Sequence, residues 1–202
     1  MTSSSQAGPA TALVTGASSG IGAATVRALR DRGFEVHAVA RREERLAQLA
    51  EETGCVVHVL DVRDREAVAA LGRELPVDIL VNNAGLGRAI GAIWRGTDDD
   101  IDRTVDTNLT AAIHVIRAVL PGMIERGRGH IVNVSSVMAL RSGHAALYGA
   151  TKGGMHMLSR DLRHELEGSG IRVSEICPGR VVTEFYDVAI DDEERRERVK
   201  DT

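Results

Sequence analysis

The stretch TGASSGIG, from Thr15 to Gly22, decides the fold of this 202-residue chain. An apolar run, ATALVT (10–15), leads directly into it, and a helical pattern begins inside it. Gly16 permits the turn out of a strand, Gly20 lets the backbone approach a ligand, and Gly22 lets the helix pack close to the sheet. The helix amino terminus offers free N–H groups and a positive dipole end to a pyrophosphate. This order of strand, glycine loop and helix indicates a nucleotide-binding site rather than a glycine-rich turn without a ligand.

The rest of the chain alternates between short apolar runs rich in valine and isoleucine and longer amphipathic segments. The near-continuous apolar character of several runs suits strands covered on both faces. The expected strands are 10–15, 34–40, 55–61, 77–83, 130–136 and 172–178, and the expected helices are 21–32, 43–52, 64–74, 98–126 and 146–168. This alternation predicts an α/β fold, a Rossmann-like, doubly wound parallel sheet of six strands with helices on both faces.

Composition and charge are those of a globular protein. The chain is 43% hydrophobic, 27% charged and 2% aromatic, with a net charge of −4. These values disfavour disorder and argue against nucleic acid or an anionic membrane as a main partner. Cys55 and Cys177 form no CxxC pair, so we expect free thiols in a reducing compartment.

The chain is expected to form one domain in the cytoplasm. Its start, MTSSSQAGPA, lacks the basic patch and apolar run of a signal peptide, and no apolar stretch approaches the ~20 residues of a membrane span. Residues 1–9 are interpreted as a disordered polar tail and residues 10–202 as a single domain. HELEG (164–168) departs from the zinc motif HExxH at its last position, so no metal site is predicted.

Four further motifs follow the glycine loop: NNAG (82–85), NVSS (133–136), YGATK (148–152) and PGRVVT (178–183). Together with the TGxxxGxG spacing they are specific, and the chain resembles the short-chain dehydrogenase/reductase family over residues 10 to 185. The resemblance implies an NAD(P)-binding domain that interconverts a small-molecule carbonyl and a secondary alcohol by hydride transfer. It also implies a homodimer or homotetramer, a seventh strand that is not visible here, and a substrate loop within 183–202 that includes Phe185 and Tyr186.

The preferred cofactor is NADP(H), with NAD(H) as the alternative. The second expected strand ends at Ala40, and Arg41 and Arg42 follow it. An acidic residue at this point would bond a ribose 2′-OH and repel a 2′-phosphate, whereas a guanidinium grips a phosphate with two hydrogen bonds. A charged helix start at RREER (41–45) is the other interpretation. Family members often carry a second basic residue where Ser19 stands here.

The resemblance implies the remaining cofactor contacts. Asp61 would accept a hydrogen bond from the adenine amine beside the backbone of Val62, although a helix N-cap is the alternative for Asp61. Thr183 would bind the nicotinamide carboxamide. The full expected set is Gly16, Ser18, Ser19, Gly20, Ile21, Gly22, Arg41, Arg42, Asp61, Val62, Asn83, Ala84, Gly85, Tyr148, Lys152, Pro178, Gly179, Val181 and Thr183.

Tyr148 and Lys152 stand four residues apart in a helical pattern, so their side chains share one helix face. Reduction of a carbonyl leaves an alkoxide that needs a proton, and a free tyrosine, with a pKa near ~10, exchanges protons poorly at neutral pH. A lysine charge ~4 Å away, at an effective dielectric near ~20, is worth about 4 kcal/mol, or roughly three pKa units. Tyr148 beside Lys152 is therefore the expected proton-transfer group, rather than an incidental surface contact.

Ser136 is the expected ligand of the substrate oxygen, with Ser135 as the alternative. Strand residues alternate faces, so one of the two points into the site. In the family the second serine of the motif is catalytic and usually stands 13 residues before the tyrosine, whereas Ser136 stands 12 before Tyr148. We prefer Ser136 because a one-residue loop deletion costs less than a shift in strand register.

Asn108, in DTNLT, interrupts the apolar pattern of the long expected helix. A kink or a core hydrogen bond would explain it, whereas the resemblance makes it the residue whose backbone holds a water that relays protons to Lys152. The expected catalytic set is thus Asn108, Ser136, Tyr148 and Lys152. Two other functions share the fold: a catalytically weak cofactor-binding sensor or scaffold, and an epimerase or dehydratase with bound NAD.

Overall fold

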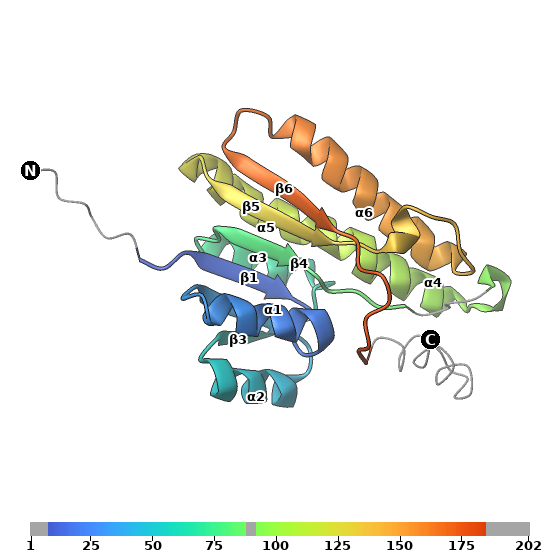
Figure 1. Cartoon of the computed structure of the whole chain (residues 1–202), viewed down its shortest axis with the longest axis horizontal. Helices are drawn as coiled ribbons and strands as arrows, with labels where there is room; N and C mark the ends of the chain where they lie inside the picture. The colour runs from blue at the N-terminus through green and yellow to red at the C-terminus, as the bar shows by residue number, and fades with distance from the viewer. Residues whose placement is uncertain (1–7, 88–91, 185–202) are drawn as a thin grey trace, which may run out of the picture.

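The computed structural model describes residues 8–87 and 92–184 (Figure 1). Most of the expected tail, residues 1–7, lies outside the described residues. The same holds for 185–202, which includes the expected substrate-loop residues Phe185 and Tyr186.

Six parallel strands form one sheet in the order β3-β2-β1-β4-β5-β6. The strands are β1 (Thr11–Thr15), β2 (Glu35–Ala40), β3 (Val56–Val59), β4 (Ile79–Asn82), β5 (Gly129–Val134) and β6 (Ile171–Ile176). The chain order reverses between β1 and β4, and such a switch point leaves a crevice at the carboxyl ends of the strands. The predicted Rossmann-like, doubly wound sheet is confirmed.

Helices cover both faces of this sheet (Figure 1). They are α1 (Gly20–Arg30), α2 (Glu43–Thr53), α3 (Arg65–Glu74), α4 (Asp98–Val105), α5 (Ala111–Arg126) and α6 (Ala146–Glu165). Neighbouring side chains of β1 pack into hydrophobic cores on opposite faces of the sheet, because strand side chains alternate. Val14 packs in a cluster with α1 and α2, and Leu13 packs in a second cluster with α3, α5 and α6.

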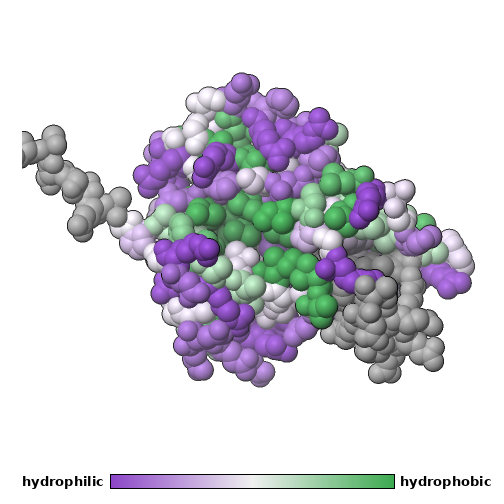
Figure 2. Space-filling view, viewed as in Figure 1, coloured by the Kyte–Doolittle hydropathy of each residue, from purple (hydrophilic) through white to green (hydrophobic). Residues whose placement is uncertain are grey.

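Part of the α1 face carries exposed apolar surface. Figure 2 shows a hydrophobic band across the side of the sheet that faces the viewer. On β6, Ile176 lies in register with Val134 and is 50% exposed. Helices α1 and α2 therefore bury this face mainly at the β1–β3 side of the described molecule.

The long helix predicted over 98–126 is continuous but not uniform. Between α4 and α5 lies one wide π-helical turn, η2 (Asp106–Thr110). By length and hydropathy the stretch 98–126 would also pass for a membrane span, contrary to the expectation from the sequence. A core helix passes the same test, and Val115 and Met123 of α5 are buried in the core.

Candidate active site

A cleft of about 740 Å³ opens where the carboxyl ends of the strands meet the glycine loop and α6. Every expected cofactor-binding residue except Gly22 lines it, and so do Ser136, Tyr148 and Lys152. Asn108 lies behind the lining, in contact with Leu86. The fold thus brings together residues that are spread over most of the chain.

The three glycines of the loop stand where a side chain would have little or no room. A Cβ at Gly16, whose φ is +66°, would stand 2.8 Å from the Cα of Ala84. A Cβ at Gly22 would overlap the carbonyl oxygen of Gly16, and one at Gly20 would stand 3.0 Å from the Thr183 side chain. At Gly16 and Gly20 the loop therefore exposes main chain, at the amino end of α1, to whatever fills the cleft. This cradle fits a pyrophosphate.

Thr15 ties the glycine loop to the NNAG loop, a role that the sequence motifs did not assign to it. Its hydroxyl accepts hydrogen bonds from the main-chain N–H groups of Asn83 and Ala84, both at 3.0 Å. In return, the amide of Asn83 donates to the Thr15 carbonyl oxygen at 3.0 Å. Asn83 therefore holds two loops together at the cleft wall.

Arg42 closes one end of the cleft. Its Nε donates to Ser18 Oγ at 3.0 Å and its Nη2 to Ser19 Oγ at 2.7 Å. Its Nη1 donates to Glu184 Oε2 at 2.7 Å, and Arg45 Nη2 lies 3.2 Å from the other carboxylate oxygen of Glu184. These arginines hold the pKa of Glu184 below its usual range. A guanidinium beside two hydroxyls suits a phosphate group, which would have to take the place of the Glu184 carboxylate on Nη1.

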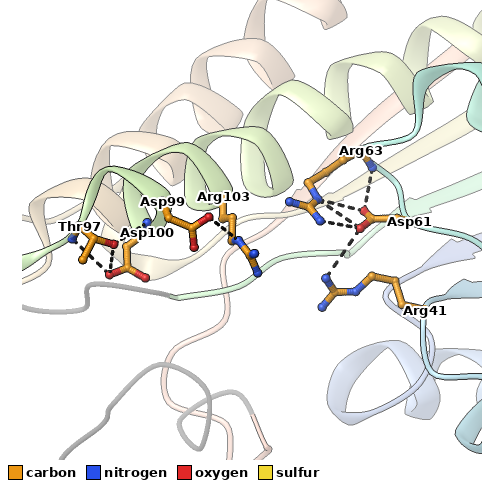
Figure 3. A network of polar contacts seen from close by, with 7 residues as sticks. All are labelled: Arg41, Asp61, Arg63, Thr97, Asp99, Asp100 and Arg103. Carbon is orange, nitrogen blue, oxygen red and sulfur yellow. Dashed lines mark hydrogen bonds and ion pairs between the residues drawn. The ribbon is translucent and has the colours of Figure 1, made fainter.

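Asp61 lies between two arginines (Figure 3). Arg63 Nη2 donates to Asp61 Oδ2 at 2.8 Å, and Arg41 Nη1 lies 3.8 Å from the same oxygen. The hydrogen bonds from Arg63 and the weaker attraction of Arg41 lower the pKa of Asp61. The helix N-cap is Asp64, which accepts from Glu66 N and Ala67 N, so Asp61 does not cap α3. Its carboxylate remains at the cleft wall, as a contact to adenine requires.

Lys152 is almost fully buried, with 5% of its surface exposed. Its Nζ donates to the Val134 carbonyl oxygen at 2.9 Å and lies 5.7 Å from the centre of the Tyr148 ring. Burial lowers the pKa of Lys152 from 10.5 to about 8, against the opposing effects of Cys177 and Glu175. The ammonium therefore stays largely charged at neutral pH, one helical turn from the phenol that it is expected to acidify.

The two serines after β5 differ in what their hydroxyls do. Ser135 Oγ donates to the Lys152 carbonyl oxygen at 3.1 Å, so it anchors the α6 backbone. Ser136 Oγ accepts from Met138 N at 3.2 Å, at the start of η3 (Val137–Ala139). This bond leaves the Ser136 proton available to a substrate oxygen in the cleft, which favours Ser136 over Ser135.

Asn108 stands in the π-helical turn η2 with 1% of its surface exposed. Its Oδ1 accepts from Leu86 N at 2.8 Å, and its Nδ2 donates to Leu86 O at 2.8 Å and to Thr151 Oγ1 at 3.2 Å. The side chain is thus fully used in fixing the loop after β4 and the start of α6. Any part of Asn108 in a proton relay falls to its main chain, in line with the expectation.

Known proteins carry the same sequence pattern. Residues 10–194 match the family model described as short chain dehydrogenase. The chain belongs to this family. The NADP-dependent 3-hydroxy acid dehydrogenase YdfG of Escherichia coli K12 is 40% identical over 185 residues, which are 87% of this chain and 75% of that protein. Sulfoacetaldehyde reductase 2 of Chromohalobacter salexigens is 41% identical over 186 residues, 86% of this chain and 73% of that protein.

Solved structures agree with the sequence relatives. The closed form of serine dehydrogenase in complex with NADP+ superposes with a TM-score of 0.89 at 37% identity, over 94% of this chain and 80% of that one. A short-chain dehydrogenase from Sphingobium yanoikuyae with NADPH gives 0.83 at 37% identity, over 90% and 76%. The predicted family and fold are confirmed, the chain is a dehydrogenase, and the NADP use of these relatives supports the preference predicted from Arg41 and Arg42.

Proposed function

We propose that this dehydrogenase interconverts a small-molecule carbonyl compound and a secondary alcohol with NADP(H). The observation that carries the proposal is the arrangement of Tyr148, Lys152 and Ser136 on the wall of the cleft that the glycine loop also lines. The relatives named above, which act on hydroxy acids and an aldehyde, support the same chemistry.

Four groups of residues would hold the cofactor, which supplies or accepts the hydride when bound. The main chain around Gly16 and Gly20 would take the pyrophosphate at the amino end of α1. Arg42, with its serine partners, would take the 2′-phosphate. Asp61 would receive the adenine amine, and Thr183 would bind the carboxamide.

Three side chains of the protein would bind the substrate oxygen and transfer the proton. Ser136 would donate its free hydroxyl hydrogen to the substrate oxygen and so hold the carbonyl in place. Tyr148 would give its phenolic proton to that oxygen in reduction and take one back in oxidation. Lys152 would favour the phenolate because its positive charge is held in a buried site nearby.

Replacement of Tyr148 by phenylalanine tests the proposal. The variant should keep NADPH binding, measured by fluorescence, and lose turnover by roughly 10²–10⁴-fold, since it lacks the proton-transfer group. Turnover is followed by NADPH absorbance against a panel of 3-hydroxy acids, aldehydes and ketones with both NADP(H) and NAD(H). Glu51→Gln, at an exposed position of α2 outside the cleft lining, is the control. Unchanged turnover in Tyr148→Phe would contradict the assignment.

We also infer a cytoplasmic homodimer or homotetramer. Helices α5 and α6 expose large apolar side chains, including Ile113 at 41%, Ile124 at 50% and Met157 at 51%. Exposed apolar groups of this kind favour association of subunits. The free thiols of Cys55 and Cys177 agree with a reducing compartment. Sedimentation of the purified protein would test the assembly, and a purely monomeric protein would contradict it.

A further inference from the structure

The buried ammonium of Lys152 needs compensation for its lost hydration. Its Nζ makes one hydrogen bond within the described protein, to the neutral carbonyl of Val134. Removal of a charge from water costs several kcal/mol unless an opposite charge or several hydrogen bonds compensate for it. A counter-charge near this group would supply such compensation and help to keep the lysine protonated.

Glu175, on β6, carries a carboxylate that packs against α6, the helix of Lys152. Its side chain is 7% exposed, and its Oε2 accepts a hydrogen bond from His156 Nδ1 at 2.7 Å. His156 follows Lys152 by one helical turn on α6, so both side chains lie on the same helix face. The other carboxylate oxygen, Oε1, is buried and has no partner in hydrogen-bond geometry among the described residues.

The strand register places Glu175 on the α6 side of the sheet. Glu175 pairs with Asn133 of β5, and residues paired across parallel strands point to the same face. The side chain of Asn133 reaches α6, where its Nδ2 donates to Ser159 Oγ at 2.9 Å. Two residues further along the chain, just after β5, Ser135 donates to the carbonyl oxygen of Lys152 itself. The carboxylate thus lies in the layer between β6 and the helix that carries the lysine.

We propose that Glu175 is a positioning residue whose carboxylate, held by His156, is the counter-charge that keeps Lys152 protonated behind the active site. The hydrogen bond to His156 Nδ1 holds the carboxylate in place against α6. The proposal rests on the proposed role of Lys152 and adds the group on which its charge depends.

The other groups that face Lys152 do not supply this charge. Tyr148 and His156 face it from α6, and the end of β6 adds the Cys177 thiol. Burial and the neighbouring Glu175 raise the pKa of Cys177, so the thiol stays neutral at neutral pH. Burial lowers the pKa of Lys152 to about 8, and Cys177 and, less strongly, Glu175 act in the opposite direction. Without Glu175 the lysine would lose its proton closer to neutrality and the phenol of Tyr148 would become a weaker acid.

The protein offers a direct measurement, because Lys152 is one of only two lysines in the chain. Growth on lysine labelled with ¹³C at Cε gives two resonances, and Lys200→Arg identifies the one that belongs to Lys152. The titration midpoint of Lys152 is followed by NMR in cofactor-free wild type, Glu175→Gln and Glu175→Asp. We expect E175Q to move the midpoint down by about one pH unit, as the loss of a negative charge from the same buried layer implies.

E175D keeps the negative charge and should titrate close to wild type. Glu175→Ser, a smaller neutral variant, replaces E175Q if that variant does not fold, as judged by circular dichroism. Glu165→Gln, at the exposed end of α6, is the matched control and should leave the midpoint unchanged. A midpoint in the neutral variants equal to wild type would overturn the proposal. An equal drop in E175D would overturn it too, because packing rather than charge would then be the cause.

The titration needs neither cofactor nor substrate, so its outcome is separate from that of the Tyr148→Phe experiment. Retained turnover in Tyr148→Phe would contradict the proposed function. It would not affect the conclusion that Glu175 shifts the titration midpoint of Lys152. An unchanged midpoint in E175Q, beside an inactive Tyr148→Phe, would remove Glu175 alone.

Discussion

Replacement of Lys152 by methionine should make the cofactor-free protein more stable and its turnover negligible. The side chain is buried, and its ammonium has a single hydrogen-bond partner, the carbonyl of Val134, within the described residues. Methionine has a similar unbranched shape and carries no charge that must be dehydrated. The buried lysine therefore lowers the stability of the folded protein and is retained for its part in the reaction, as is common for residues of active sites.

The pKa of Lys152 determines the expected gain in the free energy of unfolding of Lys152→Met. Its fall from 10.5 to about 8 on burial corresponds to about 3 kcal/mol of folding free energy lost at neutral pH. Loss of the hydrogen bond to Val134 costs about 1 kcal/mol in the variant. Lys152→Met should thus gain about 2 kcal/mol at pH 7, or roughly 4–8 °C in melting temperature.

The sign of the pH dependence follows from the same values. The folded protein holds this proton more weakly than the unfolded chain, so the penalty is complete below about pH 8. It fades as the pH rises towards 10.5, where the unfolded chain loses the proton as well. The stability gap between Lys152→Met and wild type should therefore narrow between about pH 7 and pH 9.5.

Urea denaturation of cofactor-free protein at these two pH values measures the gap. Lys200→Met, at the other lysine, is the control and should show no comparable gap. A Lys152→Met protein less stable than wild type at pH 7, or a gap that does not change with pH, would refute the reasoning.

Two further predictions concern the cleft. Ser136→Ala should lower turnover by about 10²-fold with NADPH binding retained, whereas Ser135→Ala should mainly cost stability, about 1–2 kcal/mol, because it removes a buried bond to the Lys152 carbonyl. Steady-state kinetics and melting curves separate the two, and the reverse pattern would show that Ser135 is the catalytic serine. Arg42→Ala should weaken binding of 2′,5′-ADP by about tenfold or more and leave 5′-ADP nearly unaffected, as measured by calorimetry. Equal weakening of both nucleotides would place the 2′-phosphate elsewhere.

Local sequence patterns were sufficient to predict the strands and the glycine loop. Each of the six strands falls inside its expected range or within a residue of it, because buried parallel strands are nearly continuous apolar runs. The glycine loop is equally local, since φ values such as +66° at Gly16 are accessible mainly to glycine.

Contacts between distant segments were beyond the sequence alone. Arg42 meets Glu184, 142 residues further along the chain, and no local spacing marks that pair. Glu175 looked like one more strand residue, because its contact with His156 depends on β6 and α6 packing together. At Asn108 the sequence left a kink or a core hydrogen bond open, but the partner of that bond, Leu86 after β4, was not marked by any local spacing.

The hydrogen bonds accepted by the Thr15 hydroxyl affect the affinity of the protein for its cofactor. By accepting the N–H groups of both Asn83 and Ala84, it joins two walls of the cleft into one stiff unit before any ligand arrives. Ordering a flexible residue costs about 1–2 kcal/mol, and here that cost falls on folding rather than on binding. The cofactor therefore binds to loops that are already ordered. The free energy of its contacts then contributes to affinity and is not used to order the loops.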